Sequence, residues 1–277
     1  MVIENKYLKD IETILSHRFD QGADLWTTED KRLLKGGPFS TLECISYLLD
    51  LGLSKDDEVF KQVADLIFEA WKEDGRVKVY PTGGIYPCHT AIAVEALCKM
   101  GYEKDSRVEK SLEYFLETQE SDGGWKCNKY SFGRGEETNY STPNTTLIIL
   151  DAFRYTDYLN HEKNLDRAVE FLLQHWEIRK PISPCHYGIG KLFMQCEYPF
   201  RGYNLFYYVY VLSFYNYAKR DKRFLEALKA LEDKTINNQI VVERVVPKLA
   251  KLSFCKKGEV SELATKKWNE IKENIYM

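Results

Sequence analysis

The chain has 277 residues, of which 44% are hydrophobic and 29% charged, with a net charge of -3 and a pI near 6.0. A chain of this length can bury one sizeable core or two small ones. Its charge balance gives no reason to expect nucleic-acid binding, and no apolar run approaches the roughly 18 residues of a membrane span. The amphipathic start at Met1–Leu15 lacks the apolar core of a signal peptide, and the seven cysteines suit reduced thiols. We therefore expect a cytoplasmic protein.

The clearest predicted element is a helical hairpin between Tyr86 and Cys127. Two runs of apolar residues at three- and four-residue spacing give each helix one apolar face. Gly101 stands where a left-handed residue can end the first helix, and Asp105 can cap the second. A single hairpin cannot bury both of its faces, so we expect it to recur along the chain.

The hairpin recurs with a period near 50 residues. Ser40–Gly52 aligns without a gap on His89–Gly101, at an offset of 49 residues from Thr41 to Thr90. A third copy begins at Thr145, and a looser fourth copy begins at Asn204. We predict one all-α domain over residues 1–277, with repeats at 40–76, 88–127, 143–180 and 200–233 and helical ends at 1–20 and 240–277. Stacked helix pairs of this kind form either a closed ring or an arc.

One motif carries a resemblance to a known superfamily. A helix ends at Gln119, the string Asp122-Gly123-Gly124-Trp125 follows, and a later helix opens with Thr145-Thr146. This pattern resembles the repeats of the terpenoid cyclase and protein prenyltransferase superfamily over roughly residues 40 to 232. More narrowly, the chain looks like bacterial stand-alone proteins labelled prenyltransferase-like or squalene-cyclase-like. The resemblance implies an α/α toroid whose central apolar cavity takes an isoprenoid or similar substrate, with functional loops at the N-terminal ends of the inner helices.

Two motifs of that superfamily are missing from the sequence. The Asp-x-Asp-Asp acid of squalene-type cyclases does not occur, so cyclisation by alkene protonation is not expected. His89-Thr90 resembles the histidine-bearing helix start of the protein prenyltransferases, but the Asp-x-Cys helix start that shares its zinc is absent, because the next repeat offers Thr142-Pro143-Asn144-Thr145. Resemblance alone does not imply catalysis.

Cysteine and histidine recur at the helix starts. Pro87-Cys88-His89 is repeated as Pro184-Cys185-His186, and Cys127 follows the Gly-Gly-Trp string. Zinc takes Cys and His in such combinations, so the candidate ligands are Cys88, His89, Cys127, Cys185 and His186. The spacings match no compact zinc motif, however, and the alternative is that these cysteines are packed or reactive thiols.

The candidate substrate-binding residues lie in loops and in an aromatic segment. Lys129, Arg134 and Arg201 precede inner helices, whose N-termini favour anions such as a diphosphate or carboxylate headgroup. Arg134, between two glycines, is the strongest candidate because its guanidinium can grip an oxyanion bidentately. The alternative is that these loops are simply solvated.

Half of the residues in Tyr198–Tyr217 are aromatic. Within that segment we expect Tyr207 and Tyr210 to line the cavity, together with Trp125 from the motif, and core packing is the alternative.

Two carboxylates occupy equivalent positions in the second and third repeats. Glu95 and Asp151 stand where the first repeat has Ser46 and the fourth has Tyr210. A carboxylate part-way down an inner helix can act as a general acid or base if a dry cavity raises its pKa. The alternative is a structural anchor that accepts hydrogen bonds from a neighbouring helix.

The sequence thus leaves two functions open. One is an enzyme that handles an isoprenoid or another apolar substrate with an anionic headgroup. The other is a non-catalytic lipid- or partner-binding scaffold of the same fold. The substrate, the reaction, the presence of a metal, the closure of the ring and the oligomeric state are not determined by the sequence.

Overall fold

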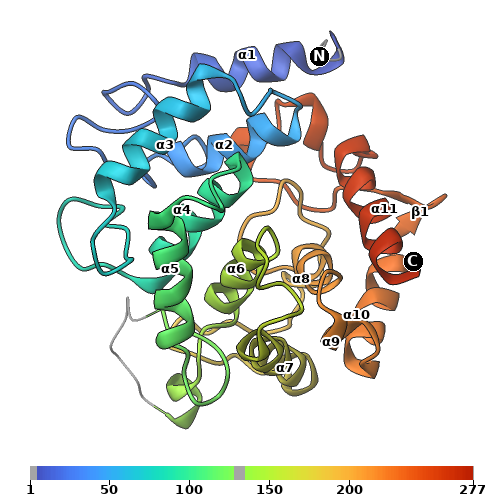
Figure 1. The fold of residues 1–277 in the computed structure, drawn as a ribbon. Coiled ribbons are helices and arrows are strands. Elements are labelled where there is room, and N and C mark those ends of the chain that lie inside the picture. The colour runs from blue at the N-terminus through green and yellow to red at the C-terminus, as the bar shows by residue number, and fades with distance from the viewer. Residues whose placement is uncertain (1–4, 128–134, 277) are drawn as a thin grey trace.

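The computed structural model describes residues 5–127 and 135–276, and the regular secondary structure in this part of the chain is almost all helical (Figure 1). The all-α fold predicted from the sequence is therefore confirmed. Within these ranges, no helix is both long and apolar enough to cross a membrane. The α-helices are α1 (Leu8–Ser16), α2 (Thr41–Asp50), α3 (Glu58–Ala70), α4 (Pro87–Met100), α5 (Ser106–Glu117), α6 (Pro143–Phe153), α7 (Lys163–Ile178), α8 (Leu205–Leu212), α9 (Asn216–Lys219), α10 (Lys222–Glu232) and α11 (Glu262–Tyr276).

The helices differ sharply in how much of their surface is buried. All eight residues of α8 and ten of the eleven in α6 are buried. In α5, by contrast, only four of twelve are buried, all on one face. An amphipathic helix covers a core with one stripe, whereas a helix that is apolar on several sides must lie inside the molecule. Helices such as α6 and α8 therefore form an inner layer, and helices such as α5 form an outer one.

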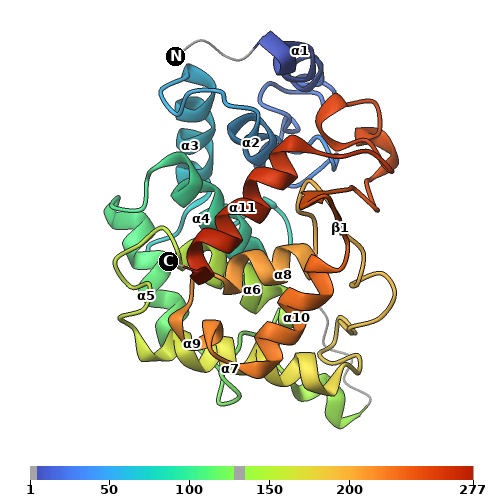
Figure 2. The same cartoon turned by 90° about the vertical axis from the view of Figure 1, so that its right-hand side faces the viewer.

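The inner helices contact one another in chain order. Helix α4 packs between α2 and α6, and α8 packs against both α6 and α11. On the outside, α3 and α5 pack on α4, α7 packs on α6, and α10 packs on α8. Figure 1 shows the chain running round the molecule from α1 through α5 and α7 to α11, and Figure 2 shows α11 lying across the inner helices from the side.

The predicted boundaries of the central hairpin are confirmed. Pro87 stands in the first turn of α4, where its missing N–H costs nothing, and Gly101 ends the helix with a φ of 94°. The Asp105 side chain caps α5 by accepting a hydrogen bond from the backbone N–H of Arg107. The local signals in the sequence were sufficient here because each terminus carries its own capping residue.

The Gly-Gly-Trp motif joins α5 to the two helices that follow. The indole N–H of Trp125 donates to the Phe115 carbonyl at 2.7 Å, and its backbone N–H donates to Thr146 Oγ1 at 3.1 Å. A Cβ on Gly123, which has a φ of 92°, would lie 2.4 Å from the carbonyl oxygen of Arg167 in α7. Only glycine fits such a close approach, so this part of the motif has a structural role: it packs the end of α5 against α6 and α7, and we call it the structural joint.

The N-terminal helix contacts the C-terminal part of the chain. The carboxylate of Asp10 in α1 accepts hydrogen bonds from the backbone and hydroxyl of Ser253, the hydroxyl at 2.6 Å. Lys267 of α11 also forms an ion pair with Asp50 of α2 at 2.9 Å. The N-terminal and C-terminal segments are thus linked by buried and half-buried polar contacts.

One predicted element is wrong. Residues 240–260, predicted as part of a helical end, contain no α-helix: β1 (Thr235–Ile236) pairs antiparallel with β2 (Gln239–Ile240), and Val241 bridges to Val260. The segment Ile240–Val246 is rich in β-branched residues, which prefer extended backbone, and Pro247 follows directly. Two short 3₁₀-helices, η3 (Pro247–Leu249) and η4 (Ser253–Cys255), follow, and α11 is the only α-helix in the described residues after α10.

Candidate functional site

A cavity of about 610 Å³ opens at the N-terminal ends of the inner helices. Helices α4 and α6 contribute residues of their first turns, including Cys88 and Asn144, and the loop before α8 contributes Cys185 and Arg201. Its volume lies within the range typical of small-molecule sites. The full lining is Leu34, Gly37, Glu43, Tyr80, Cys88, His89, Ile92, Cys127, Thr142, Asn144, Thr145, Pro184, Cys185, Tyr187 and Arg201.

Three cysteines from different segments meet at this cavity. The sulfurs of Cys88 and Cys127 lie 3.1 Å apart. Cys127 is held in place because its backbone N–H donates to Thr142 Oγ1 at 3.0 Å, at the start of α6. Burial raises the pKa of Tyr187 to about 12, and the neighbouring thiols of Cys185, Cys127 and Cys88 contribute to the rise. All three thiols therefore surround one phenol.

The two histidines among the predicted zinc ligands are placed differently in the structure. His89 lies on the cavity wall, and its ring contacts those of Tyr80 and Tyr86, each at 5.3 Å between centroids. His186 does not line the cavity; it sits in a tight turn with a φ of 52°. Within residues 5–127 and 135–276, no group of three or more His, Cys, Asp or Glu side chains is arranged to hold a metal ion.

A second, smaller cavity of about 190 Å³ adjoins the first. The two share five lining residues, namely Leu34, Glu43, Ile92, Asn144 and Arg201. The smaller cavity reaches further along the inner helices, to Glu95 and Lys99 of α4 and Tyr207 of α8. Its remaining lining is Leu42, Ser46, Tyr47, Ile148, Phe200 and Gly202.

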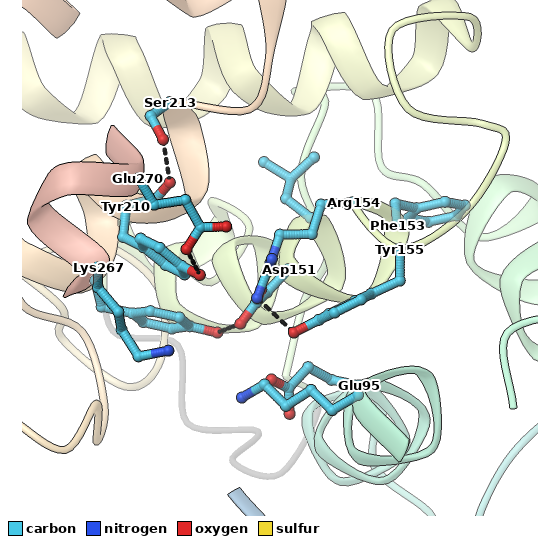
Figure 3. A network of polar contacts seen from close by, with 12 residues as sticks. Glu95, Asp151, Phe153, Arg154, Tyr155, Tyr210, Ser213, Lys267 and Glu270 are labelled. Atoms are coloured by element: carbon cyan, nitrogen blue, oxygen red, sulfur yellow. Dashed lines mark hydrogen bonds and ion pairs between the residues drawn. The ribbon is translucent and has the colours of Figure 1, made fainter. Parts of the chain in front are cut away.

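A buried network of charged groups lies behind the smaller cavity. Asp151 of α6 accepts hydrogen bonds from Arg154, one turn further along the same helix, and from the Tyr207 hydroxyl at 2.8 Å. Glu95 forms an ion pair with Lys99 on α4. Figure 3 shows Asp151 and Arg154 facing each other, with Glu95 opposite them on the neighbouring helix.

The pKa values of the two carboxyl groups are shifted in opposite directions. Burial raises the pKa of Glu95 to about 7, and the nearby Asp151 adds to the rise while Lys99 opposes it. Burial would also raise the pKa of Asp151, but the charges of Arg154 and Lys99 and hydrogen bonds from Arg154 and Tyr207 outweigh it and hold that pKa below its ordinary value. Adjacent carboxyls whose pKa values are pushed apart are the arrangement used for acid–base work. Glu95 is thus the group that can exchange a proton near neutral pH, and Asp151 is the fixed charge beside it.

The other predicted substrate-binding residues are dispersed. Arg201 lines both cavities and is paired with Glu43, with 2.9 Å between Arg201 Nε and Glu43 Oε1. Tyr210 is buried and donates to Glu270 at 2.7 Å, outside both cavity walls. Trp125 is 1% exposed and belongs to the structural joint rather than to either wall. Lys129 and Arg134 lie outside the described residues.

Several residues of the site were missed by sequence reasoning. Lys99 and Arg154 follow Glu95 and Asp151 by four and three residues, and these spacings place opposite charges on one helix face. That signal was readable in the sequence. Glu43 was not predictable as the partner of Arg201, because 158 residues separate them and only the fold brings them together.

Comparison with known proteins adds no identification. No family model matches the chain, and no curated protein is significantly similar to it.

Proposed function

We propose that the chain is a single α/α toroid domain of the terpenoid cyclase and prenyltransferase type, and that its central cavity binds an apolar small molecule such as an isoprenoid. The path of contacts through α2, α4, α6, α8 and α11 supports the toroid. So does the ion pair between Lys267 and Asp50, which links the last of these helices to the first.

The observation that carries the binding proposal is an unsatisfied hydroxyl in the smaller cavity. Tyr47 is 2% exposed, and within the described part of the chain its buried hydroxyl oxygen has no hydrogen-bond partner. An unpaired buried polar group costs about 1–3 kcal/mol. The surrounding wall includes the apolar side chains of Leu42, Ile92 and Ile148. A mainly apolar ligand with one polar atom near Tyr47 would satisfy this environment.

The proposed ligand carries an anionic headgroup next to Arg201. This guanidinium lines both cavities, and Glu43 accepts hydrogen bonds from its Nε and one terminal nitrogen. The second terminal nitrogen remains to donate to a carboxylate or phosphate oxygen. The apolar part of the ligand then extends along the wall formed by Leu34 and Ile92, which the two cavities share.

If the protein is an enzyme, Glu95 is its acid–base group. A carboxyl with a pKa of about 7 is matched to proton transfer at oxygen, nitrogen or sulfur near neutral pH. It is too weak an acid to protonate an alkene, in agreement with the missing cyclase motif. A non-catalytic binding protein remains the second candidate, because Glu95 and Lys99 also neutralise each other's charge as an ion pair. The cytoplasmic location stays a prediction.

The test is direct detection of a ligand. Native mass spectrometry of the purified protein, followed by solvent extraction, should reveal a retained apolar molecule. In a second step, farnesol and a farnesyl phosphate are added to delipidated protein, and binding is followed by tryptophan fluorescence and melting temperature.

Two variants make the binding test specific. Ile92→Trp fills the shared wall and should abolish binding, whereas Glu117→Trp, on the exposed face of α5, should leave it intact. The proposal also expects the phosphate to bind more tightly than the alcohol, and Arg201→Gln to remove that difference. Equal binding by Ile92→Trp and the unmodified protein would contradict a cavity site. Failure to retain or bind any apolar molecule would contradict the function as a whole.

A further inference from the structure

The thiols at the mouth of the larger cavity form a site that the binding proposal does not use. Cys88 stands in the first turn of α4, and Cys127 follows the structural joint, so two rigid segments hold the sulfurs 3.1 Å apart. A disulfide bond needs a separation of about 2.05 Å, and side-chain rotation can supply a change of this size. The pair is 39 residues apart in the sequence, which means that only the fold creates it.

Cys88 is the more accessible thiol of the pair. Cys127 is only 5% exposed, whereas Cys88 is half-buried and lines the cavity, so a small molecule can reach it. Four of the other cysteines differ, because Cys44, Cys98, Cys196 and Cys255 are each 0% exposed.

We propose that Cys88 and Cys127 are a redox-active dithiol that reacts with low-molecular-weight disulfides. The Cys88 thiolate attacks one sulfur of the disulfide RSSR, forms a mixed disulfide and expels RS⁻. The Cys127 thiolate then attacks the Cys88 sulfur, forms the Cys88–Cys127 disulfide and expels the second RS⁻. The protein dithiol loses two electrons and two protons, and RSSR becomes two RSH.

In the oxidised form, a covalent bond would link Cys127 to the start of α4, beside His89. Cys185, the third thiol at the cavity, comes from the separate loop before α8. The inference does not depend on the identity of the cavity ligand, so it can fail or succeed independently of the proposed function.

The experiment uses the full chain and oxidised glutathione. After incubation, the native protein is alkylated without reduction, digested and mapped by mass spectrometry. We expect a peptide pair joined through Cys88 and Cys127, the loss of two reactive thiols, and full reversal by dithiothreitol. Cys44, Cys98, Cys196 and Cys255 should remain unmodified unless the protein is denatured.

Three variants assign the roles of the thiols. Cys127→Ser should trap glutathione on Cys88, because the resolving thiol is gone, and Cys88→Ser should form no disulfide with Cys127. Cys185→Ser should still form the Cys88–Cys127 disulfide. The proposal is overturned if the unmodified protein keeps a stable mixed disulfide, if Cys185 takes the place of either partner, or if no thiol reacts in the native state. Mapping of the unmodified protein decides the question even if a variant fails to fold.

Discussion

Replacing Glu95 with glutamine should remove a specific pH dependence from the stability of the protein. Burial raises the folded-state pKa of Glu95 to about 7 from an ordinary value of 4.5. Each unit of difference corresponds to about 1.36 kcal/mol, so the full effect is about 3 kcal/mol. Because the folded pKa is the higher one, this stability is fully present below pH 4.5 and is lost as the pH rises to about 7. Glutamine resembles the protonated carboxyl and does not titrate.

The assay is denaturant unfolding of both proteins between about pH 4.5 and pH 8. The free energy of unfolding of the unmodified protein, minus that of Glu95→Gln, should fall by about 3 kcal/mol across this range and then level off. Taking the difference cancels the titration of all other groups. Glu12→Gln, which removes an exposed carboxylate on α1, serves as the control and should give a small difference throughout. A difference that stays constant, or that grows with pH, would refute the burial argument for Glu95.

Three further predictions test the surrounding structure. Asp151→Asn leaves the buried Arg154 without its counter-charge and should lower the free energy of unfolding by about 3–5 kcal/mol, measured with denaturant. Tyr207→Phe removes one hydrogen bond to the same carboxylate and should lower it by about 1–2 kcal/mol. Equal small effects would show that the network does not stabilise the fold. Gly124→Ala would place a Cβ 2.5 Å from Ser141 Cβ and should lower the melting temperature by several degrees, while Gly190→Ala, whose Cβ would meet nothing within 4 Å, should leave it almost unchanged. Oxidation of Cys88 and Cys127 closes a 39-residue loop and should raise the free energy of unfolding by about 4 kcal/mol, measured with and without reductant; an unchanged stability would count against the pairing.

The helices and the hairpin boundaries were predictable because each depends on local signals. Gly101 and Asp105 mark the ends of α4 and α5 by their own backbone and side-chain chemistry. The segment Ile240–Val246 shows the opposite case. Its β-branched residues favour an extended backbone locally, but the residues that pair with it, Val260 and those near Cys196, lie outside the segment and come together with it only in the fold.

The site was predictable only where the repeat placed residues in register. Cys88, Cys127 and Cys185 were grouped as candidate ligands because a Pro-Cys-His string occurs twice and Cys127 follows the Gly-Gly-Trp string, and all three line the larger cavity. Zinc binding by these residues stays a prediction, since metal coordination also requires a particular geometry. Trp125 was expected to contact substrate because it belongs to the most distinctive motif. In the structure, its indole instead fixes the end of α5.

The repeat also explains why a charged network lies inside the inner layer. Ser46, Glu95, Asp151 and Tyr210 occupy the same position in four successive repeats, and neighbouring inner helices pack side by side. Equivalent positions are therefore brought together, which puts Glu95 next to Asp151. Lys99 bridges from Glu95 to the Ser46 hydroxyl at 3.3 Å.

Arg154 extends the same band of polar groups to the fourth repeat. Its guanidinium pairs with Asp151 and lies 5.0 Å from the centroid of the Tyr210 ring, a distance suited to a cation–π contact. The two cations balance the two carboxylates only while Glu95 is ionised. Protonation of Glu95 leaves one excess positive charge next to the smaller cavity, so an anionic ligand bound there should bind more tightly below about pH 7 than above it. Isothermal titration of a farnesyl phosphate at about pH 6 and pH 8 measures this difference, and an unchanged difference in Glu95→Gln would show that another group is responsible.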